Sequence, residues 1–194
     1  MLTFIVAVFF LLITPGPGVL STAGVGSAYG YRPGLRYLFG LMIGQNLVFL
    51  AVATGLAAIM LSTPGLRQVL LVLSALYLGF LAFKIATAGS KIAFIESSSA
   101  PGLVNGILLQ LINPKAYAVN TTLYSGFAYA ADSPLFEVVT KLLILNAIWL
   151  PIHMLWLAAG VNLKRLALDD STQRMINIAM AISMLLVVAL ALLS

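Results

Sequence analysis

The stretch that decides the fold runs from residue 102 to residue 127 and has the sequence GLVNGILLQLINPKAYAVNTTLYSGF. It is long and apolar enough to cross a bilayer, yet Asn113, Pro114 and Lys115 interrupt it near its middle. At a rise of about 1.5 Å per residue, these three residues lie roughly 15 Å into the span, close to the membrane midplane. The stretch is therefore predicted to be a discontinuous helix.

An interruption at this depth is energetically expensive. Pro114 removes a backbone N–H donor from the helix, and a lysine at the bilayer centre costs about 2.5–3.5 kcal/mol on insertion scales. Broken backbone is tolerated in a membrane only where protein buries it or where it lines a water-filled cavity. We therefore expect Asn113, Pro114 and Lys115 to lie at a polar site.

The composition places the chain among polytopic membrane proteins. Of its 194 residues, 62% are hydrophobic and 8% are charged, and the mean hydropathy is +1.10. We predict an all-α membrane protein with six transmembrane helices, the first of them retained rather than cleaved as a signal peptide. The predicted spans are 2–24, 37–61, 68–88, 103–127, 138–160 and 174–193.

Basic residues predict the topology. The ten Lys and Arg residues form no dense patch, so no nucleic-acid partner is expected. Seven of them fall in or beside alternate connections, against only Arg67 and Lys141 on the other side, while Lys115 is intramembrane. The positive-inside rule then places both termini outside. Because the chain has no cysteine, disulfides and thiolate metal sites are excluded, and no metal or cofactor is expected.

The first span contains a second interruption, TPGPG at residues 14–18, about twelve residues from its start. Pro15 and Pro114 lie 99 residues apart. Pro33 and Pro134, which precede the predicted second and fifth spans, lie 101 residues apart. These nearly equal offsets indicate that the chain consists of two copies of one unit.

The two copies are predicted to be inverted repeats within one membrane domain, residues 1–97 and 98–194. Each copy has three spans, so the second must cross the membrane in the opposite sense, as in many secondary transporters. In that plan, interrupted helices at matching positions mark the binding site. Discontinuous helices 1 and 4 are therefore expected to meet at the substrate.

The two interruptions each leave two interpretations open. Residues 15–18 free backbone groups that can meet a substrate's charges, or they form a kink that neighbouring helices satisfy. Lys115 either binds a substrate carboxylate or neutralises carbonyl groups at the broken helix end. Gly40-x-x-x-Gly44 and Gly102-x-x-x-Gly106 allow close helix packing within one chain or a contact between two copies in a homodimer.

Two polar stripes accompany the interruptions. Asn113, Tyr117, Asn120 and Tyr124 share one face of the fourth span, which either lines a cavity or holds the bundle together through hydrogen bonds. The fifth span has a similar face, formed by Asn146, Trp149, His153 and Trp156. His153 is the only histidine, and it serves either a functional role or a packing role.

The sequence resembles the LysE-type amino-acid exporters, including the homoserine/threonine-export branch. The resemblance covers most of the chain, in the family's order. It consists of TPGPG (14–18), GYRPG (30–34), ALYLGFLAFK (75–84) and GLVNGILLQLINPKA (102–116). It implies a proton-driven exporter of amino acids or related small solutes in the bacterial inner membrane.

One departure from that family concerns proton coupling. Members often have a carboxylate in the second span and another in the fifth, where this chain has the amides Gln45 and Asn146. An amide cannot change its protonation during a transport cycle. Either His153 has taken over the role, or the protein is an uncoupled facilitator.

The predicted function is export of amino acids or related small zwitterions by alternating access, and no enzymatic activity is expected. The alternatives are an exporter of a metal or other inorganic ion and a non-transporting membrane scaffold. The expected partners are the small-molecule substrate and the lipid bilayer. The predicted substrate-binding residues are Thr14, Pro15, Gly16, Pro17, Gly18, Gln45, Asn113, Pro114, Lys115, Tyr117, Asn120, Asn146 and His153.

Overall fold

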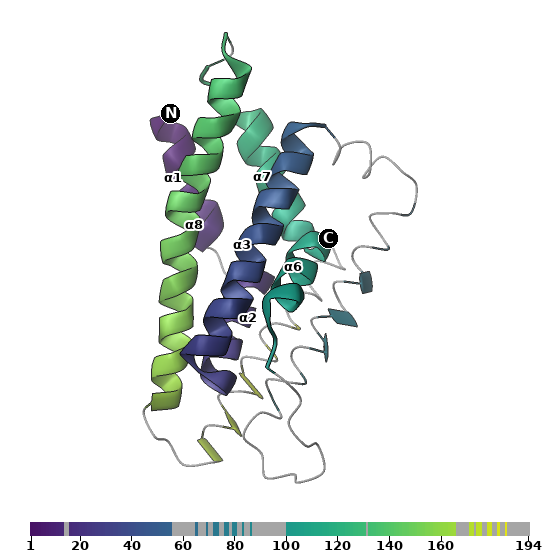
Figure 1. Ribbon diagram of the computed structural model, residues 1–194, viewed down its shortest axis with the longest axis vertical. Helices are drawn as coiled ribbons and strands as arrows, with labels where there is room; N and C mark the ends of the chain where they lie inside the picture. The colour runs from purple at the N-terminus through teal and green to yellow at the C-terminus, as the bar shows by residue number, and fades with distance from the viewer. Residues whose placement is uncertain are drawn as a thin grey trace.

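The computed structural model describes residues 1–13, 16–55, 100–130 and 132–165, with scattered positions between 65 and 86 and between 171 and 185. The longer described stretches fold into helices without strands (Figure 1). The helices are α1 (Leu2–Ile13), α2 (Pro17–Tyr29), α3 (Tyr31–Ala53), α6 (Leu103–Ile112), α7 (Pro114–Gly126) and α8 (Pro134–Arg165).

Both predicted interruptions break a helix. The first span consists of α1 and α2, whose axes differ by 50°, and the fourth consists of α6 and α7. Proline is the first residue of the second half in each case. Proline is tolerated there because the N–H group that it lacks would have no partner within the first turn of a helix. Asn113 caps α7, its side-chain oxygen accepting a hydrogen bond from Lys115 N over 3.1 Å.

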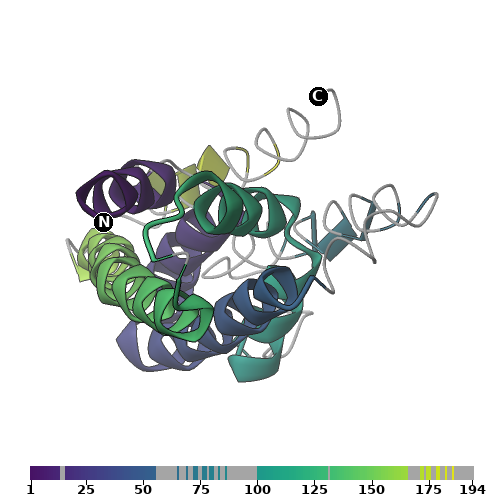
Figure 2. The ribbon, with the colours of Figure 1, turned by 90° about the horizontal axis from the view of Figure 1, so that it is seen from above.

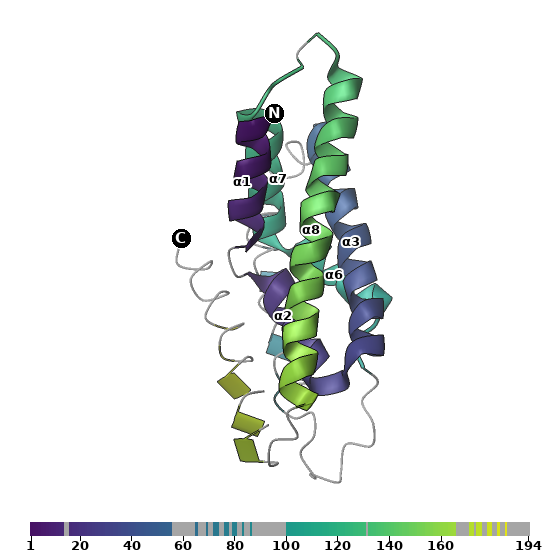
Figure 3. The same cartoon turned by 90° about the vertical axis from the view of Figure 1, so that its left-hand side faces the viewer.

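The two broken spans run in opposite directions through the bundle. Figure 3 shows α1 and α7 together at one end, with α2 continuing from α1 towards the other end. The contacts agree, because α1 packs against α7 and α2 packs against α6. The long helices α3 and α8 run beside them (Figure 3), and the view from above in Figure 2 shows α8 between α1 and α3. This arrangement brings the two breaks to the same level.

Small residues allow the closest helix contacts. A Cβ atom on Gly40 or Gly106 would collide with backbone atoms of the facing helix, at Leu103 in the first case and at Tyr37 in the second. At Gly44 it would lie 2.7 Å from Gln110 Cβ. Packing within the chain is therefore confirmed for Gly40, Gly44 and Gly106.

A second close contact, between α2 and α8, also depends on glycine. A Cβ on Gly160 would collide with the backbone of Ala23, and one on Gly26 would lie 2.8 Å from the carbonyl oxygen of Leu157. The two contacts hold α3 against α6 and α2 against α8 at backbone distance. They fix how the halves of the broken spans sit on the long helices.

The predicted bounds of the second span were wrong. Helix α3 begins at Tyr31 and ends at Ala53, whereas the sequence predicted 37–61. Gly30 alone separates α2 from α3, at a φ of 86°, and Pro33 is accommodated in the first turn of α3. Gly55, at a φ of 76°, follows the end of α3.

Helix α8 is longer than the fifth span predicted from the sequence, residues 138–160. It extends from Pro134 to Arg165 without ending at Pro151. Within the described residues, α3 and α8 are each long and apolar enough to cross a membrane, and the bent pair α1–α2 gives a third such span. The predicted spans 68–88 and 174–193 and the boundary between the two repeats lie mostly outside the described residues.

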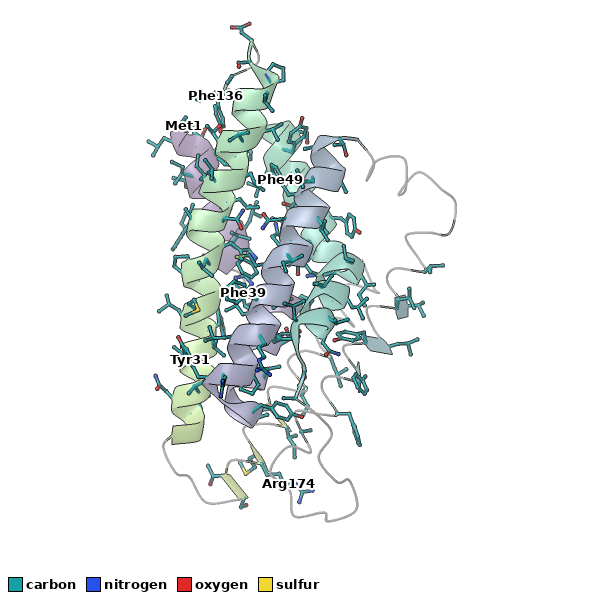
Figure 4. The ribbon with its side chains drawn as sticks, in the orientation of Figure 1. Met1, Tyr31, Phe39, Phe49, Phe136 and Arg174 are labelled. Carbon is teal, nitrogen blue, oxygen red and sulfur yellow. The ribbon has the colours of Figure 1, made fainter. Side chains whose placement is uncertain are left out.

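The outer face of the bundle is apolar. Phe39 of α3 and Phe136 of α8, both labelled in Figure 4, are each 53% exposed. Exposed Leu, Ile, Val and Phe side chains also occur along α1 and α6. A lipid environment suits such a surface better than water does.

The N-terminal end of α8 contains a buried ion pair. Glu137 precedes the predicted fifth span, 138–160, but it lies in the first turn of α8, where its carboxylate is 2.6 Å from Lys141 Nζ. Lys141 is fully buried and donates a second hydrogen bond, of 2.7 Å, to the carbonyl oxygen of Tyr124 at the end of α7. Its ammonium group also lies 5.1–5.7 Å from the ring centres of Phe4, Tyr124 and Tyr129.

Candidate functional site

A cavity of about 40 Å³ lies where the two broken spans meet α3 and α8. That volume exceeds the roughly 10–15 Å³ that one water needs on a comparable measure. The lining combines an apolar wall with a few polar groups. The lining residues are Leu11, Leu12, Gly16, Pro17, Gly18, Val19, Gln45, Gln110, Asn113, Lys115, Ala116, Val119, Trp149 and His153.

Two helix N-termini meet at this cavity. Helix α2 begins at Pro17 and helix α7 at Pro114, and residues from the first turn of each line the wall. Backbone N–H groups of a first turn lack partners within the helix, and each N-terminus has about half a positive charge. The cavity is thus suited to an anion such as a carboxylate.

Lys115 adds a full positive charge to the same place. Its side chain reaches from α7 to the break in the first span, where a Cβ atom on Gly16 would lie 2.8 Å from Lys115 Cδ and 3.0 Å from Nζ. A side chain at position 16 would displace the end of the lysine from this position. The geometry therefore joins the two interruptions that the sequence paired.

Four side-chain amides form a chain of hydrogen bonds beside the cavity. Asn113 Nδ2 donates to Gln110 Oε1 over 3.4 Å, and Gln110 Nε2 donates to Gln45 Oε1 over 2.5 Å. Gln45 Nε2 then donates to Asn120 Oδ1 over 2.9 Å. All four residues are buried, so these bonds connect α6, α3 and α7 in a region without competing water.

The direction of this chain is fixed at both ends. Asn113 Oδ1 accepts the backbone N–H of Lys115, so its Nδ2 must be the group that faces Gln110. At the other end, Asn120 Nδ2 donates to the carbonyl oxygen of Ala116, which cannot donate in return. Each amide between them therefore has one orientation that satisfies its neighbours.

His153 lies on the opposite wall, stacked on Trp149 with ring centres 3.6 Å apart and planes at 16°. Its Nδ1 is 2.9 Å from the carbonyl oxygen of Trp149. A carbonyl only accepts, so Nδ1 carries a proton and Nε2 of the neutral ring is an acceptor. Nε2 points towards Gly18 of α2.

Several predicted site residues do not line the cavity. Tyr117 packs beside it and donates a 2.8 Å hydrogen bond to the carbonyl oxygen of Leu111, a group left over at the broken end of α6. Asn120 does not line the cavity but accepts a hydrogen bond from Gln45 in the amide chain. For this residue the structure agrees with the second interpretation of the polar stripe, in which hydrogen bonds hold the bundle together. Pro114 shapes the break without lining the cavity. Thr14 and Pro15 lie outside the described residues.

Asn146 also lies away from the cavity lining. Its side-chain amide exchanges two hydrogen bonds with that of Asn46. Asn146 Nδ2 donates to Asn46 Oδ1 over 2.7 Å, and Asn46 Nδ2 donates to Asn146 Oδ1 over 3.2 Å. Gly16, Pro17, Gly18, Gln45, Asn113, Lys115 and His153 are the predicted residues that the fold brings together around the cavity.

Sequence reasoning missed Gln110 and Asn46. Gln110 is three residues before Asn113 and so lies on the same face of the span. The predicted polar stripe started at Asn113 and therefore did not include it. Asn46 follows Gln45 directly, but no local pattern indicates that it pairs with a residue 100 positions later.

The sequence matches the LysE type translocator family over residues 9–194. The chain belongs to this family. The match begins within α1 and includes α2, the other broken span and both long helices, so all the cavity-lining residues lie within the family region. The resemblance seen in the sequence motifs is confirmed. No solved structure matches the chain.

Proteins named for amino-acid efflux are similar to this chain. It is 32% identical to a leucine efflux protein of Enterobacter sp. (strain 638) over 119 residues, which is 59% of this chain and 56% of the relative. It is 27% identical over 151 residues to a cysteine/O-acetylserine efflux protein of Salmonella choleraesuis, covering 76% of this chain and 75% of the relative. The chain thus spans a little over half the length of the leucine efflux proteins that it matches.

Proposed function

We propose that this LysE type translocator exports small neutral amino acids across the bacterial inner membrane by alternating access. The observation that supports the proposal best is the cavity shared by the two broken spans, with helix N-termini and Lys115 on one side. The names of the similar efflux proteins support the same class of solute.

The substrate carboxylate is assigned to Lys115 and the first turn of α2. Lys115 Nζ lies next to Gly16, directly before that turn. A charged hydrogen bond from lysine and the N–H groups of a helix N-terminus both favour a carboxylate over a neutral group. The same pairing of an anionic group with a broken helix occurs in other transporter folds.

The cavity favours a substrate whose side chain is uncharged. Among the described residues that line it, Lys115 is the one charged side chain, and none is a carboxylic acid. A lysine or arginine substrate would therefore place a second cation near Lys115 without an anion to balance it. The apolar lining residues, such as Leu12 and Val119, suit an aliphatic side chain instead.

The packing of the two long helices supports an inverted repeat. Helix α3 packs against both α6 and α7, which form the broken span of the other half, and α8 packs against both α1 and α2. If α1, α2 and α3 are exchanged with α6, α7 and α8, these four contacts are exchanged with one another, as a two-fold relation would require. The cavity lies at the level of both breaks, the position expected for a site served alternately from either side.

The volume of the cavity supports movement during transport. About 40 Å³ holds water but is small beside the roughly 300–1,000 Å³ of typical ligand pockets. Binding an amino acid would require the half-helices to separate. The glycine contacts of α6 on α3 and of α2 on α8 make each pair a rigid unit, so separation between those units is the proposed motion.

We further propose that transport is not driven by protons. Gln45 is bound on both sides within the amide chain, and Asn146 is bound to Asn46, so neither position offers a group that exchanges protons. His153 is the remaining candidate for coupling, and its Nδ1–H is held by a backbone carbonyl.

One reconstitution experiment tests the function and the coupling together. Purified protein in liposomes is loaded with a mixture of amino acids and inorganic ions, a pH gradient of either sign is imposed, and the released solutes are identified. Release of neutral amino acids down their own gradient, unchanged by the pH gradient, is the expected result. Release of a metal or other inorganic ion instead, or no release at all, would favour the ion-exporter or scaffold alternative.

A further inference from the structure

Gly18 of α2 lies close to two hydrogen-bond acceptors. A Cβ atom added at this residue would lie 3.3 Å from His153 Nε2 and 3.8 Å from Gln110 Oε1. The two atoms come from α8 and α6, on different walls of the cavity. The backbone of residue 18 therefore borders a small space that acceptors face from two directions.

The amide chain determines which atom of Gln110 faces this space. Gln110 Nε2 is used as the donor to Gln45 Oε1, because Gln45 Nε2 must donate to Asn120. Gln110 Oε1 consequently points away from α3, towards Asn113 and Gly18. Its one hydrogen bond from Asn113 is long, at 3.4 Å, and a carbonyl oxygen has two lone pairs, so it can accept a second donor.

The contacts of His153 determine its orientation in the same way. The hydrogen bond of Nδ1 to Trp149 O and the stacking of the two rings together hold the imidazole in one place. Its Nε2 lone pair therefore faces Gly18 without a rotation of the side chain. Both acceptors are held in position before any ligand arrives, which lowers the entropic cost of binding.

Resting on the proposed function, we infer that Gln110 Oε1 and His153 Nε2 form the subsite for the α-ammonium group of the substrate. Lys115 Nζ lies beside Gly16, two residues earlier on the same backbone, where the carboxylate is assigned. The ammonium and carboxylate of an amino acid are separated by a single carbon, so neighbouring subsites along residues 16–18 match that spacing. Two neutral acceptors bind the ammonium here in place of a carboxylate.

Ligands that lack the amino group provide the test. Binding of L-leucine and 4-methylpentanoate, and of L-alanine and propanoate, is measured calorimetrically at pH 8 with the full-length protein in detergent. Gln110→Met and His153→Phe each remove one acceptor, and His153→Phe keeps an aromatic ring to stack on Trp149. Each variant should bind the amino acid at least tenfold more weakly and the corresponding acid within about twofold of wild type.

Two further variants separate recognition from folding. His153→Gln, whose carbonyl oxygen can replace Nε2, should bind the amino acid within about threefold of wild type. Trp156→Phe, on the same helix but away from the cavity lining, should match wild type for both ligands. The unliganded proteins are compared by thermal unfolding.

The outcomes distinguish this inference from the function on which it rests. Equal losses for amino acid and acid in Gln110→Met and His153→Phe, or no loss in either, would overturn the ammonium subsite alone. A wild-type protein that binds neither L-leucine nor L-alanine would overturn the proposed function as well. Weaker binding of the acids with unchanged binding of the amino acids would assign the two residues to the carboxylate instead.

Discussion

The side-chain amides of Asn46 and Asn146, which lie 100 residues apart, donate hydrogen bonds to each other across the contact between α3 and α8. Each amide nitrogen also donates to the carbonyl oxygen four residues earlier in its own helix, at Met42 and Leu142. The two residues therefore have matching surroundings. A pair of this kind is expected where a two-fold axis relates two inverted repeats.

The first prediction is that Asn46 and Asn146 are coupled energetically. In a double-mutant cycle, Asn46→Ala and Asn146→Ala should each destabilise the protein, and the double variant should lose less than their sum. The expected coupling energy is about 0.6–1.7 kcal/mol, the range found for interhelical hydrogen bonds in membranes. Unfolding free energies in mixed detergent measure it, and strictly additive losses would show that the pair contributes nothing beyond its separate contacts.

The second prediction concerns Lys115. Lys115→Met should abolish amino-acid release from liposomes while the protein still inserts and purifies normally, because the carboxylate loses its cation. Lys115→Arg should restore only part of the flux, since guanidinium and ammonium groups differ in shape and the space beside Gly16 is narrow. Full transport by the methionine variant would remove Lys115 from the carboxylate site.

The third prediction uses two glycines as a matched pair. Gly18→Ala places a methyl group 3.3 Å from His153 Nε2, within the proposed ammonium subsite, and should lower flux at least tenfold. Gly126→Ala, at the end of α7, meets no atom within 4 Å and should transport normally. Flux is compared at equal protein per liposome. Similar activity of the two variants would argue against a substrate group beside residue 18.

The fourth prediction concerns the ion pair at the start of α8. Glu137→Gln should destabilise the protein more than Lys141→Met, because it leaves a fully buried cation without its anion, an effect of about 3 kcal/mol or more. After Lys141→Met, the Glu137 carboxylate still accepts backbone hydrogen bonds from Tyr129 and Ala130. Thermal unfolding in detergent ranks the two variants. The reverse order would mean that the three aromatic rings hold Lys141 without help from Glu137.

The fifth prediction is the topology. Single cysteines at exposed Asp132 and exposed Arg32 can be labelled separately because the chain has no other cysteine. A membrane-impermeant thiol reagent should label position 132 in intact cells and position 32 only after permeabilisation, as the positive-inside rule requires. The opposite pattern would place both termini inside.

The breaks were predictable because they depend on the chemistry of single residues. Proline lacks an N–H wherever it occurs in a helix, so Pro114 interrupts the fourth span whatever packs against it. The end of α3 was harder to predict, since residues up to 61 are apolar and hydropathy alone does not detect the turn at Gly55. The start of α8 was placed too late because the charge of Glu137 is paired with Lys141 within the fold, which hydropathy cannot show.

The site was predictable in part for the same reason. Lys115 and Gly16 belong to the two interruptions, so their meeting follows once the breaks are known to face each other. The positions of Asn120 and Tyr117 on one helix face were also foreseeable, but not whether that face would meet a cavity or another helix. Hydrogen bonding to α3 and to the end of α6 settled that choice.

By itself, the sequence determined that this protein is a helical membrane protein with two spans broken at matching depths, because hydrophobic length and proline act locally. Only the tertiary structure decided that Gln110 meets Gln45 and that Asn46 meets Asn146, across 65 and 100 residues of chain. Those partners are set by how closely α3 approaches α6 and α8. The close approach of α3 to α6 depends on Gly40, Gly44 and Gly106. The direction of each amide then follows from the backbone groups at the two ends of the chain of hydrogen bonds: the N–H of Lys115 donates at one end, and the carbonyl group of Ala116 accepts at the other.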